Sequence, residues 1–292
     1  MIYHSTAFGD LKISLADPEG EDGRRLFAHY VWNAGVLLAE MICGGLRNEG
    51  EAGSAGETVR GRDWSVKGQR VLELGAGMLL SRIYSDFFSS SFQTLLPSNQ
   101  SLLLFCSLSP GSALPSLSSA LSSPTSVVIT DYPTPTFSTV TSANISTNIP
   151  VLFRSHVSHF PHKWADFSTS FAMEHKGSFT RILAADVLWL PSQHLALLES
   201  VQWFLADAAD GGKVAEAWVV AGFHTGRGLV GRFLKIAEEK VTLEVGFVRE
   251  VNVETGIERE WQGMEYADNE EGGKGRWCII IVLRRRSSAS GT

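Results

Sequence analysis

Four short apolar runs constrain the fold of this chain more than any other feature of its sequence. Each run ends in turn-forming residues, and the runs span 69–77, 126–133, 180–190 and 216–224. Helical spacing follows the last two runs, at 192–205 and 228–241, and Ser192 is the expected N-cap of the first of these helices. Continuous apolar strands that alternate with helices are typical of a parallel sheet covered on both faces. We therefore predict a doubly wound α/β fold around a mostly parallel, twisted sheet.

The C-terminal part of the chain has a different pattern. The runs 241–254 and 275–286 are separated by a polar segment without helical spacing. Two strands joined without a helix are expected to pair in antiparallel fashion. We predict that they form a hairpin at one edge of a seven-stranded sheet. Residues 1–283 would form a single domain, and residues 284–292 a disordered tail.

Composition excludes several classes of protein. Hydrophobic residues make up 44% of the chain, enough for a large core, and 31 acidic against 25 basic side chains give a net charge of −6. A protein that binds duplex nucleic acid carries a basic face, so this balance favours a basic protein partner or none. The three cysteines, Cys43, Cys106 and Cys278, lack the spacing of a disulfide framework or a zinc site.

Signals for export or membrane insertion are missing from the sequence. The N-terminal stretch has no basic region followed by an apolar run, as a signal peptide would. The most apolar window, 95–108, is interrupted by Pro97, Asn99 and Gln100, whereas a membrane span needs about 20 apolar residues. We expect a cytoplasmic monomer that binds neither a membrane nor nucleic acid.

Residues 87–130 contain no Asp, Glu, Lys or Arg, in a chain that is 19% charged. A long loop without periodicity inside a compact domain needs an explanation. A glycine-rich turn that holds a nucleotide is followed about 20 residues later by an acidic residue for the ribose. Gly77 and Asp131 are 131 − 77 = 54 positions apart, and removing the 34 residues of 78–111 leaves 54 − 34 = 20.

We interpret 78–111 as a disordered insertion, with retained intron sequence as its origin, because pyrimidine-rich codons encode such a Ser-, Leu- and Phe-rich composition. Without it, Leu114, Leu117 and Leu121 mark one face of a helix, and Pro115 falls in its first turn, where proline is tolerated. A genuine surface insertion is the alternative. Sequencing the transcript across the junction separates the two.

The residues that carry chemistry begin with Glu73, Gly75 and Gly77, at the end of the first apolar run. Glycines permit positive φ angles and let a ligand approach the main chain closely. A dinucleotide fingerprint would continue to a third glycine, which is missing here, so an NAD oxidoreductase is disfavoured. Asp131 closes the next strand, where a carboxylate can accept both hydroxyl groups of a ribose. Capping of the turn before Pro133 is the alternative role of Asp131.

Further motifs follow in order along the chain. They are VWNAG (31–35), VLELGAG (71–77), ALPSL (113–117), VVITDYP (127–133), PHKWA (161–165), ILAADVLWL (182–190) with SQH (192–194), and AGFHTGRG (221–228). Together they resemble the fungal branch of the methyltransferase-16 group of class I, seven-β-strand methyltransferases. Members of this group are described as nicotinamide N-methyltransferase-like and are related to lysine and N-terminal methyltransferases of translation elongation factor 1-alpha. The resemblance spans 27–283 outside the insertion and implies S-adenosyl-L-methionine as the cofactor.

The resemblance also implies which residues bind the cofactor. Trp32 would pack beside its methionine moiety, and Asp131 would bind its ribose. Trp164 would lie against the adenine, where a flat aromatic ring can stack. Core packing is the alternative for both tryptophans. The remaining residues, along the amino-acid and ribose side, would be Glu73, Gly75 and Gly77.

Three residues would serve the methyl acceptor. Asp186 begins the sequence DVLW where relatives show D-x-x-Y, which implies a place near the transferred methyl group. Trp189 would shape the acceptor site, but tryptophan in place of tyrosine removes a hydroxyl group and argues against a simple transfer of lysine specificity. His224 would guide an acceptor amine or take up its proton. Helix capping by Asp186 and a structural role for His224 are the alternatives.

His156, His159 and His162 raise the question of a metal site. They recur every three residues without carboxylates at ligand spacing, so we interpret them as solvated loop histidines and expect no metal.

We expect an S-adenosylmethionine-dependent N-methyltransferase that acts on a lysine or N-terminal amine of a protein such as a translation elongation factor. A small-molecule, nicotinamide-like N-methyltransferase is one alternative. An inactive binding protein with the methyltransferase fold is the other, if 78–111 is genuine, because the insertion lengthens the loop expected to close on the cofactor.

Overall fold

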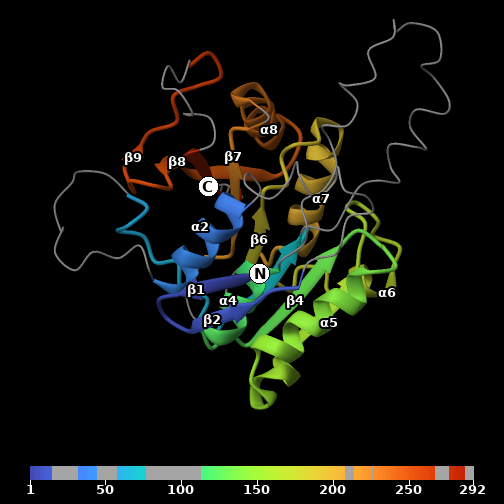
Figure 1. Cartoon of the computed structure of the whole chain (residues 1–292). Coiled ribbons are helices and arrows are strands. Elements are labelled where there is room, and N and C mark those ends of the chain that lie inside the picture. Colours follow the sequence, from blue (N-terminus) through green and yellow to red (C-terminus); the bar gives the residue numbers. More distant parts are fainter. Residues whose placement is uncertain are drawn as a thin grey trace, which may run out of the picture.

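A central sheet and a separate two-stranded hairpin organise the part of the chain that the structure describes (Figure 1). The computed structural model describes residues 1–14, 32–44, 58–76, 113–207, 214–224, 226–266 and 276–286. The strands are β1 (Ile2–Ser5), β2 (Gly9–Lys12), β3 (Arg70–Leu74), β4 (Ser126–Asp131), β5 (Val157–Pro161), β6 (Arg181–Ala185), β7 (Glu216–Gly222), β8 (Leu243–Asn252), β9 (Glu258–Arg259) and β10 (Trp277–Arg285). The helices are α2 (Trp32–Cys43), α4 (Leu114–Leu121), α5 (Phe137–Asn148), α6 (Ser170–Glu174), α7 (His194–Phe204) and α8 (Arg227–Glu239), with short 3-10 helices η1 (Val151–His156) and η2 (Pro191–Gln193).

The sheet has the order β5-β4-β3-β6-β7-β10-β8-β9. The first five of these strands are parallel, and β10 runs antiparallel between β7 and β8. The predicted fold class, a mostly parallel sheet with an antiparallel C-terminal pair, is confirmed. The two-residue β9 adds an eighth strand to the seven predicted. The hairpin of β1 and β2 escaped prediction because four-residue strands carry too little periodicity.

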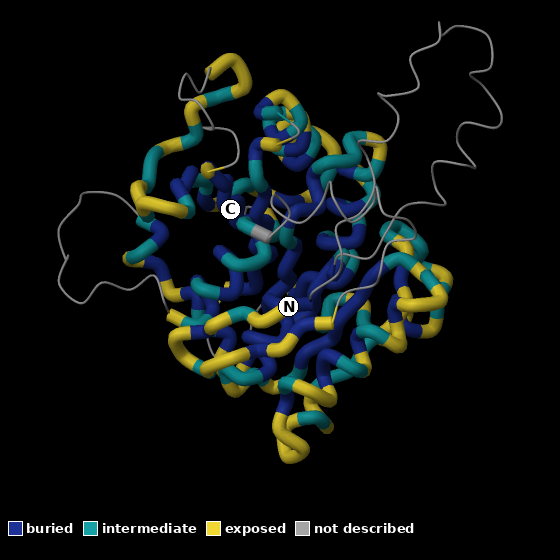
Figure 2. The backbone as a smooth tube through the Cα atoms, in the orientation of Figure 1, coloured by how far each residue is buried: buried dark blue, intermediate teal, exposed yellow. Residues whose placement is uncertain are grey.

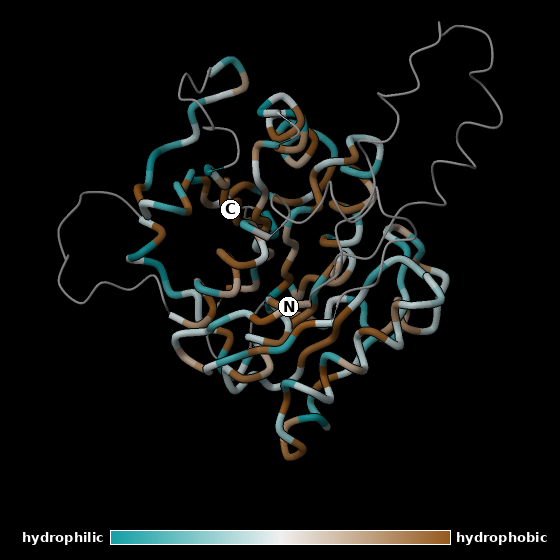
Figure 3. The backbone as a smooth tube through the Cα atoms, viewed as in Figure 1, coloured by the Kyte–Doolittle hydropathy of each residue, from teal (hydrophilic) through white to brown (hydrophobic). Residues whose placement is uncertain are grey.

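Alternate residues of the strands face two separate hydrophobic clusters. One cluster joins strand residues such as Val71 to helices α2, α4 and α5, and the other joins the residues between them, such as Leu72, to α6, α7 and α8. The strands are accordingly the most deeply buried and among the most hydrophobic parts of the chain (Figures 2 and 3). Burial on both faces explains why their sequences are continuous apolar runs.

The amphipathic helix predicted directly after 78–111 forms as α4. Leu114 and Leu117 are fully buried, and Pro115 occupies the first turn. No helix in the described ranges is both long and apolar enough to span a membrane.

Two predicted boundaries are wrong. Ser192 lies within η2 and Gln193 takes the N-cap position of α7, because the chain forms a 3-10 turn at Pro191 before the α-helix begins. Strand β10 extends into the predicted tail (284–292): Arg284 Nη2 donates to Glu216 Oε1 at 2.7 Å, and Arg285 Nη2 donates to the Leu205 carbonyl at 2.7 Å. Residues 287–292 and the predicted insertion 78–111 lie outside the described residues.

The strand order reverses between β3 and β6. From β3 the sheet continues through β4 and β5 on one side, and from β6 through β7 on the other. In open α/β sheets, ligands bind outside the carboxyl ends of the strands at such a reversal. The residues that directly follow β3 and β6 therefore define the place to look for a site.

Candidate functional site

The turn after β3 lies directly against the end of β4. The main-chain N–H groups of Gly75 and Ala76 both donate to the Thr130 carbonyl, each at 3.0 Å. Because Leu74 pairs with Thr130 in the parallel register, Gly75 is level with Asp131. The predicted neighbours Gly75 and Asp131 are thus brought together.

Only glycine fits the bend at position 75. Its φ is +78°, a left-handed conformation that favours glycine. A Cβ built there would lie 3.0 Å from Cζ2 of Trp164 and 3.0 Å from Cγ1 of Val187. The half-buried indole of Trp164 therefore packs over the main chain of the bend.

Asp131 lies buried at the end of β4. Its Oδ1 accepts the N–H of Tyr132 at 2.6 Å, so the turn-capping role is present. Its main-chain carbonyl accepts the N–H of His162 at 2.7 Å, which fixes the start of the loop that carries Trp164. A carboxylate offers about four lone-pair positions and can accept several hydrogen bonds at once.

Glu73 contacts the first turn of helix α4, a contact that the sequence did not predict. Its carboxylate is buried, and Oε2 accepts the N–H of Ser116 in the first turn of α4 at 3.2 Å. This helix has no side-chain cap of its own at Ala113, and Glu73 supplies that cap from a neighbouring strand. Burial raises the pKa of Glu73 to about 7, against the lowering effect of Ser116 and with a smaller raising effect from Asp131.

Asp186 follows β6 at the same edge of the sheet. Its φ is 57°, its N–H donates to the Val220 carbonyl at 2.8 Å, and its carboxylate accepts the N–H of Gly222. Burial raises the pKa of Asp186 to about 6, although His224 and the Gly222 N–H act to lower it. The Cys278 thiol is fully buried nearby, and burial raises its pKa, with a smaller effect from the Asp186 charge.

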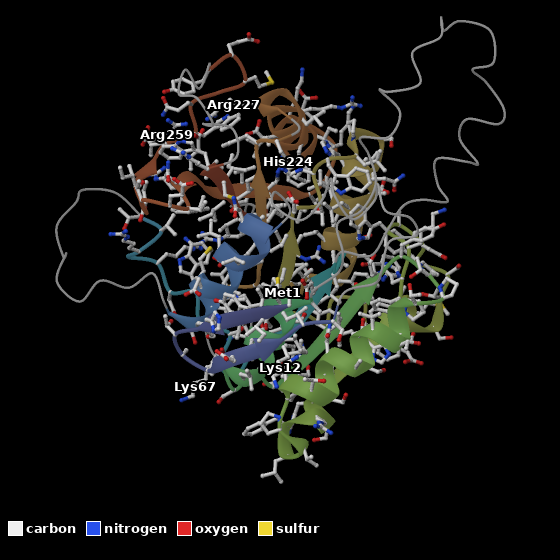
Figure 4. The ribbon with its side chains drawn as sticks, viewed as in Figure 1. Met1, Lys12, Lys67, His224, Arg227 and Arg259 are labelled. Carbon is white, nitrogen blue, oxygen red and sulfur yellow. The ribbon has the colours of Figure 1, made fainter. Side chains whose placement is uncertain are left out.

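His224 lies just beyond the end of β7, close to the start of α8 (Figure 4). Its Nε2 is 3.7 Å from Oδ1 of Asp186, within ion-pair distance but beyond hydrogen-bond distance. The His224 side chain is 31% exposed, whereas that of Asp186 is 8% exposed. Trp189 lies in the turn between β6 and η2 and is half-buried.

Two predicted cofactor residues, Trp32 and Gly77, lie partly or wholly outside the described residues. Trp32 is the first residue of α2, and its side chain lies outside the described part of the structure. Gly77 also lies outside the described residues.

The three clustered histidines differ from one another. His156 is exposed and lies within hydrogen-bond distance of the Thr125 carbonyl, at 3.1 Å, and His159 lies in β5. The interpretation of His162 as a solvated loop residue is wrong: it is 1% exposed and packs between Phe171 and Phe204. Among the described residues, no group of three or more His, Cys, Asp or Glu side chains is placed to hold a metal ion.

Sequence reasoning missed four residues that build the site. Thr130 anchors the glycine bend, Ser116 and Gly222 donate main-chain N–H groups to Glu73 and Asp186, and buried His162 begins the loop that leads to Trp164. Parallel register between β3 and β4 could have identified Thr130. The other three depend on contacts between distant segments and leave no local signal.

Comparisons with known proteins locate the chain only by its fold. No protein-family model and no curated protein matches it. A Streptococcus mutans protein described as a SAM-dependent methyltransferase is 8% identical, with a TM-score of 0.44 over 75% of this chain and 45% of that one. A ribosomal protein L11 methylase from Lactobacillus delbrueckii subsp. bulgaricus is 14% identical, with a TM-score of 0.40 over 76% and 72% of the two chains.

The arsenic(III) S-adenosylmethionine methyltransferase CrArsM from Chlamydomonas reinhardtii is 15% identical, with a TM-score of 0.41 over 77% of this chain and 65% of that one. This chain spans less than half the length of the Streptococcus mutans protein, at 45%. With TM-scores below 0.5, these similarities carry no argument about activity, and the case for a function rests on the site itself.

Proposed function

We propose that this chain is an S-adenosylmethionine-dependent N-methyltransferase. The observation that carries the proposal is the glycine bend at Gly75, hydrogen-bonded to the strand end that presents Asp131 and covered by Trp164. The cofactor contains a nucleoside without phosphate groups. One sheet edge offers three features that match it: a glycine turn, a carboxylate and an aromatic ring. The missing third glycine and the acidic edge argue against a pyrophosphate.

Each of these residues would hold a different part of the cofactor. Gly75 allows close approach to the main chain, Asp131 accepts the ribose hydroxyl groups, and Trp164 offers the ring for adenine. When bound, S-adenosylmethionine supplies an activated methyl group on a sulfonium. The protein's own contribution is alignment of the acceptor with that methyl group and exclusion of water.

Asp186 would bind the methyl acceptor. It lies at the end of β6, next to β3 in the sheet, and Val187 reaches the Gly75 bend. A buried carboxylate gains most from a positively charged partner, so an ammonium group fits this position. Trp189, in the adjoining turn, would form part of the wall around the acceptor.

A protein amine is the favoured acceptor. The motifs resemble a group that is related to elongation-factor methyltransferases, which supports this choice, and the net charge of −6 favours a basic partner. We place a lysine or N-terminal amine of a translation factor ahead of a nicotinamide-like small molecule.

Transfer of a labelled methyl group tests the proposal. The full chain is incubated with labelled S-adenosylmethionine and a fractionated lysate, and in parallel with nicotinamide. We expect label in a discrete protein fraction, and loss of that label with Asp131→Ala, whose folding is checked by circular dichroism. Absence of label from both acceptors, together with no binding of S-adenosylhomocysteine, would refute the proposal.

A further inference from the structure

The Asp186–His224 pair connects the buried edge of the sheet to solvent. Asp186 is buried at the reversal of strand order, and His224 is the partly exposed neighbour that faces its carboxylate. We propose that the two residues form a proton relay that carries one proton from an ammonium acceptor to solvent, which makes a primary amine, and not a pyridine nitrogen, the substrate class of this site. The inference rests on the proposed methyl transfer.

The carboxylate of Asp186 is held in place by its main chain. The residue adopts a left-handed conformation that few side chains favour, and its N–H is fixed to the Val220 carbonyl at 2.8 Å. Such strained conformations persist where the surrounding structure holds them and are frequent at functional sites. The N–H of Gly222 reaches the carboxylate from the same neighbouring strand, β7, so β7 fixes both the main chain and the side chain of Asp186.

Two further ionisable groups of the described residues lie on the neighbouring elements β10 and α8. The Cys278 thiol, on β10, is fully buried, and burial raises its pKa, so it stays protonated. Arg227, at the start of α8, donates to both carboxylate oxygens of Glu250, at 2.6 and 2.8 Å. His224 is thus the group placed to pass a proton from an ammonium bound at Asp186 to water.

The chemistry of the acceptor decides whether a relay is needed. An ammonium group has no free electron pair, so it must give up a proton before its nitrogen can attack. The proton passes from the ammonium nitrogen to Nε2 of His224, and the imidazolium then releases a proton to water. The amine electron pair next forms the N–C bond while the C–S bond breaks, and the sulfur keeps the bonding pair.

A pyridine acceptor such as nicotinamide differs at the first step. Its ring nitrogen carries no proton at neutral pH, so methylation releases none and no relay is required. The binding step also favours an amine over a pyridine. An ammonium group supplies the buried Asp186 carboxylate with a positively charged partner, whereas a neutral pyridine does not. The separation of 3.7 Å between Nε2 and Oδ1 is compatible with this role, since such contacts commonly shorten when the substrate binds.

The test uses the full chain with His224→Gln, and with His4→Gln as its matched control. His4 Nδ1 lies 2.6 Å from Asp10 Oδ1 in the β1–β2 hairpin, so the control alters a second, exposed His–Asp pair outside the central sheet. Methyl transfer from labelled S-adenosylmethionine to total soluble protein is measured between pH 6 and 10, with nicotinamide in parallel. Titration of the Asp186 carboxyl carbon by ¹³C NMR gives a readout independent of activity.

We expect His224→Gln to slow transfer to protein by about 100-fold at pH 7, the scale of general base catalysis. The deficit should shrink toward pH 10, where a lysine amine loses its proton unaided. Removing His224 should also raise the pKa of Asp186 above about 6, since His224 acts to lower it. The His4→Gln variant should match the wild type in both measurements.

Two results separate this inference from the proposed function. If the wild type transfers methyl groups to protein but His224→Gln keeps the same rate at every pH, or if nicotinamide is the better acceptor, the relay is refuted and methyl transfer stands. If the wild type neither transfers methyl groups nor binds S-adenosylhomocysteine, the proposed function falls, and the relay falls with it.

Discussion

Buried carboxylates at the two edges of the central sheet differ in their charged partners. At the amino edge, Glu216 begins β7 and accepts bonds from Arg62 at 2.5 Å and Arg284 at 2.7 Å. At the carboxyl edge, Glu73 and Asp186 have no lysine or arginine within ion-pair distance among the described residues. Among the described residues, the carboxylate at one edge is paired with arginines, whereas those at the other edge have no arginine or lysine partner.

The pKa values follow this difference. Burial by itself would raise the pKa of Glu216, but the Trp218 N–H and the neighbouring arginines lower it overall. Burial dominates at the other edge and raises the pKa of Glu73 to about 7 and of Asp186 to about 6. Ionisable groups shifted toward neutral pH are typical of functional sites, whereas paired groups are typical of structural networks.

The largest expected effect is at the amino edge. Replacement of Glu216 by Gln removes the charge that pairs with buried Arg62 and with Arg284, and we expect the free energy of unfolding to fall by about 3–5 kcal/mol. Urea denaturation measures this change. The control is Glu254→Gln, which breaks an exposed ion pair with Arg276 and should cost less than about 1 kcal/mol. Equal effects of the two variants would erase the difference between buried and exposed pairs.

The buried side chain of His162 predicts that the stability of the fold depends on pH. Burial lowers its pKa to about 4, so the folded chain keeps it neutral while the unfolded chain takes up a proton near pH 6.5. The unfolded state therefore binds more protons as pH falls from 6.5 to 4, and stability decreases by up to ~3 kcal/mol. Urea denaturation at pH 7 and pH 4.5 should show a smaller loss in His162→Phe. An identical loss in both proteins would rule His162 out as the cause.

Asp186 should respond to substitution in the direction opposite to Glu216. Its pKa is raised from 3.8 to about 6, so the folded chain loses stability as pH rises through this interval. Asp186→Asn removes the buried charge, and Asn tolerates the left-handed conformation, so we expect a gain of about 2 kcal/mol at pH 7 that vanishes near pH 3.5. Methyl transfer should be lost in the same variant. Destabilisation at pH 7 would place Asp186 in the structural class with Glu216.

The sheet could be predicted because each buried strand is a continuous apolar run of neighbouring residues. Apolar runs such as 180–190 reveal buried strands directly, and the three leucines of α4 reveal one helix face. The adjacency of Gly75 and Asp131 followed from spacing once 78–111 was set aside. At the described ends of this range, the N–H of Ala113 donates to the Ala76 carbonyl at 3.4 Å, although the two residues are far apart in sequence.

Other features of the fold and the site could not be predicted, because they depend on contacts between residues that are far apart in the sequence. Arg284 and Arg285 read as the start of a solvated tail, yet Glu216 and the Leu205 carbonyl hold them in β10. His162 reads as a polar loop residue, yet aromatic rings from α6 and α7 enclose it. Glu73 is predicted to line the cofactor, and its additional hydrogen bond to the first turn of α4 leaves no signal in the local sequence.

Calorimetric titration with S-adenosylhomocysteine tests the central claim, that the bend at Gly75 and the carboxylate of Asp131 bind one nucleoside. The most direct form uses the chain without 78–111, in which Ala76 and Ala113 become residues i and i + 3 and their hydrogen bond closes an ordinary turn. We expect saturable heat from this variant, and affinity lower by roughly 10- to 100-fold after Asp131→Ala, the loss of hydrogen bonds to a charged group. No heat from a deletion variant that still unfolds cooperatively would contradict the claim.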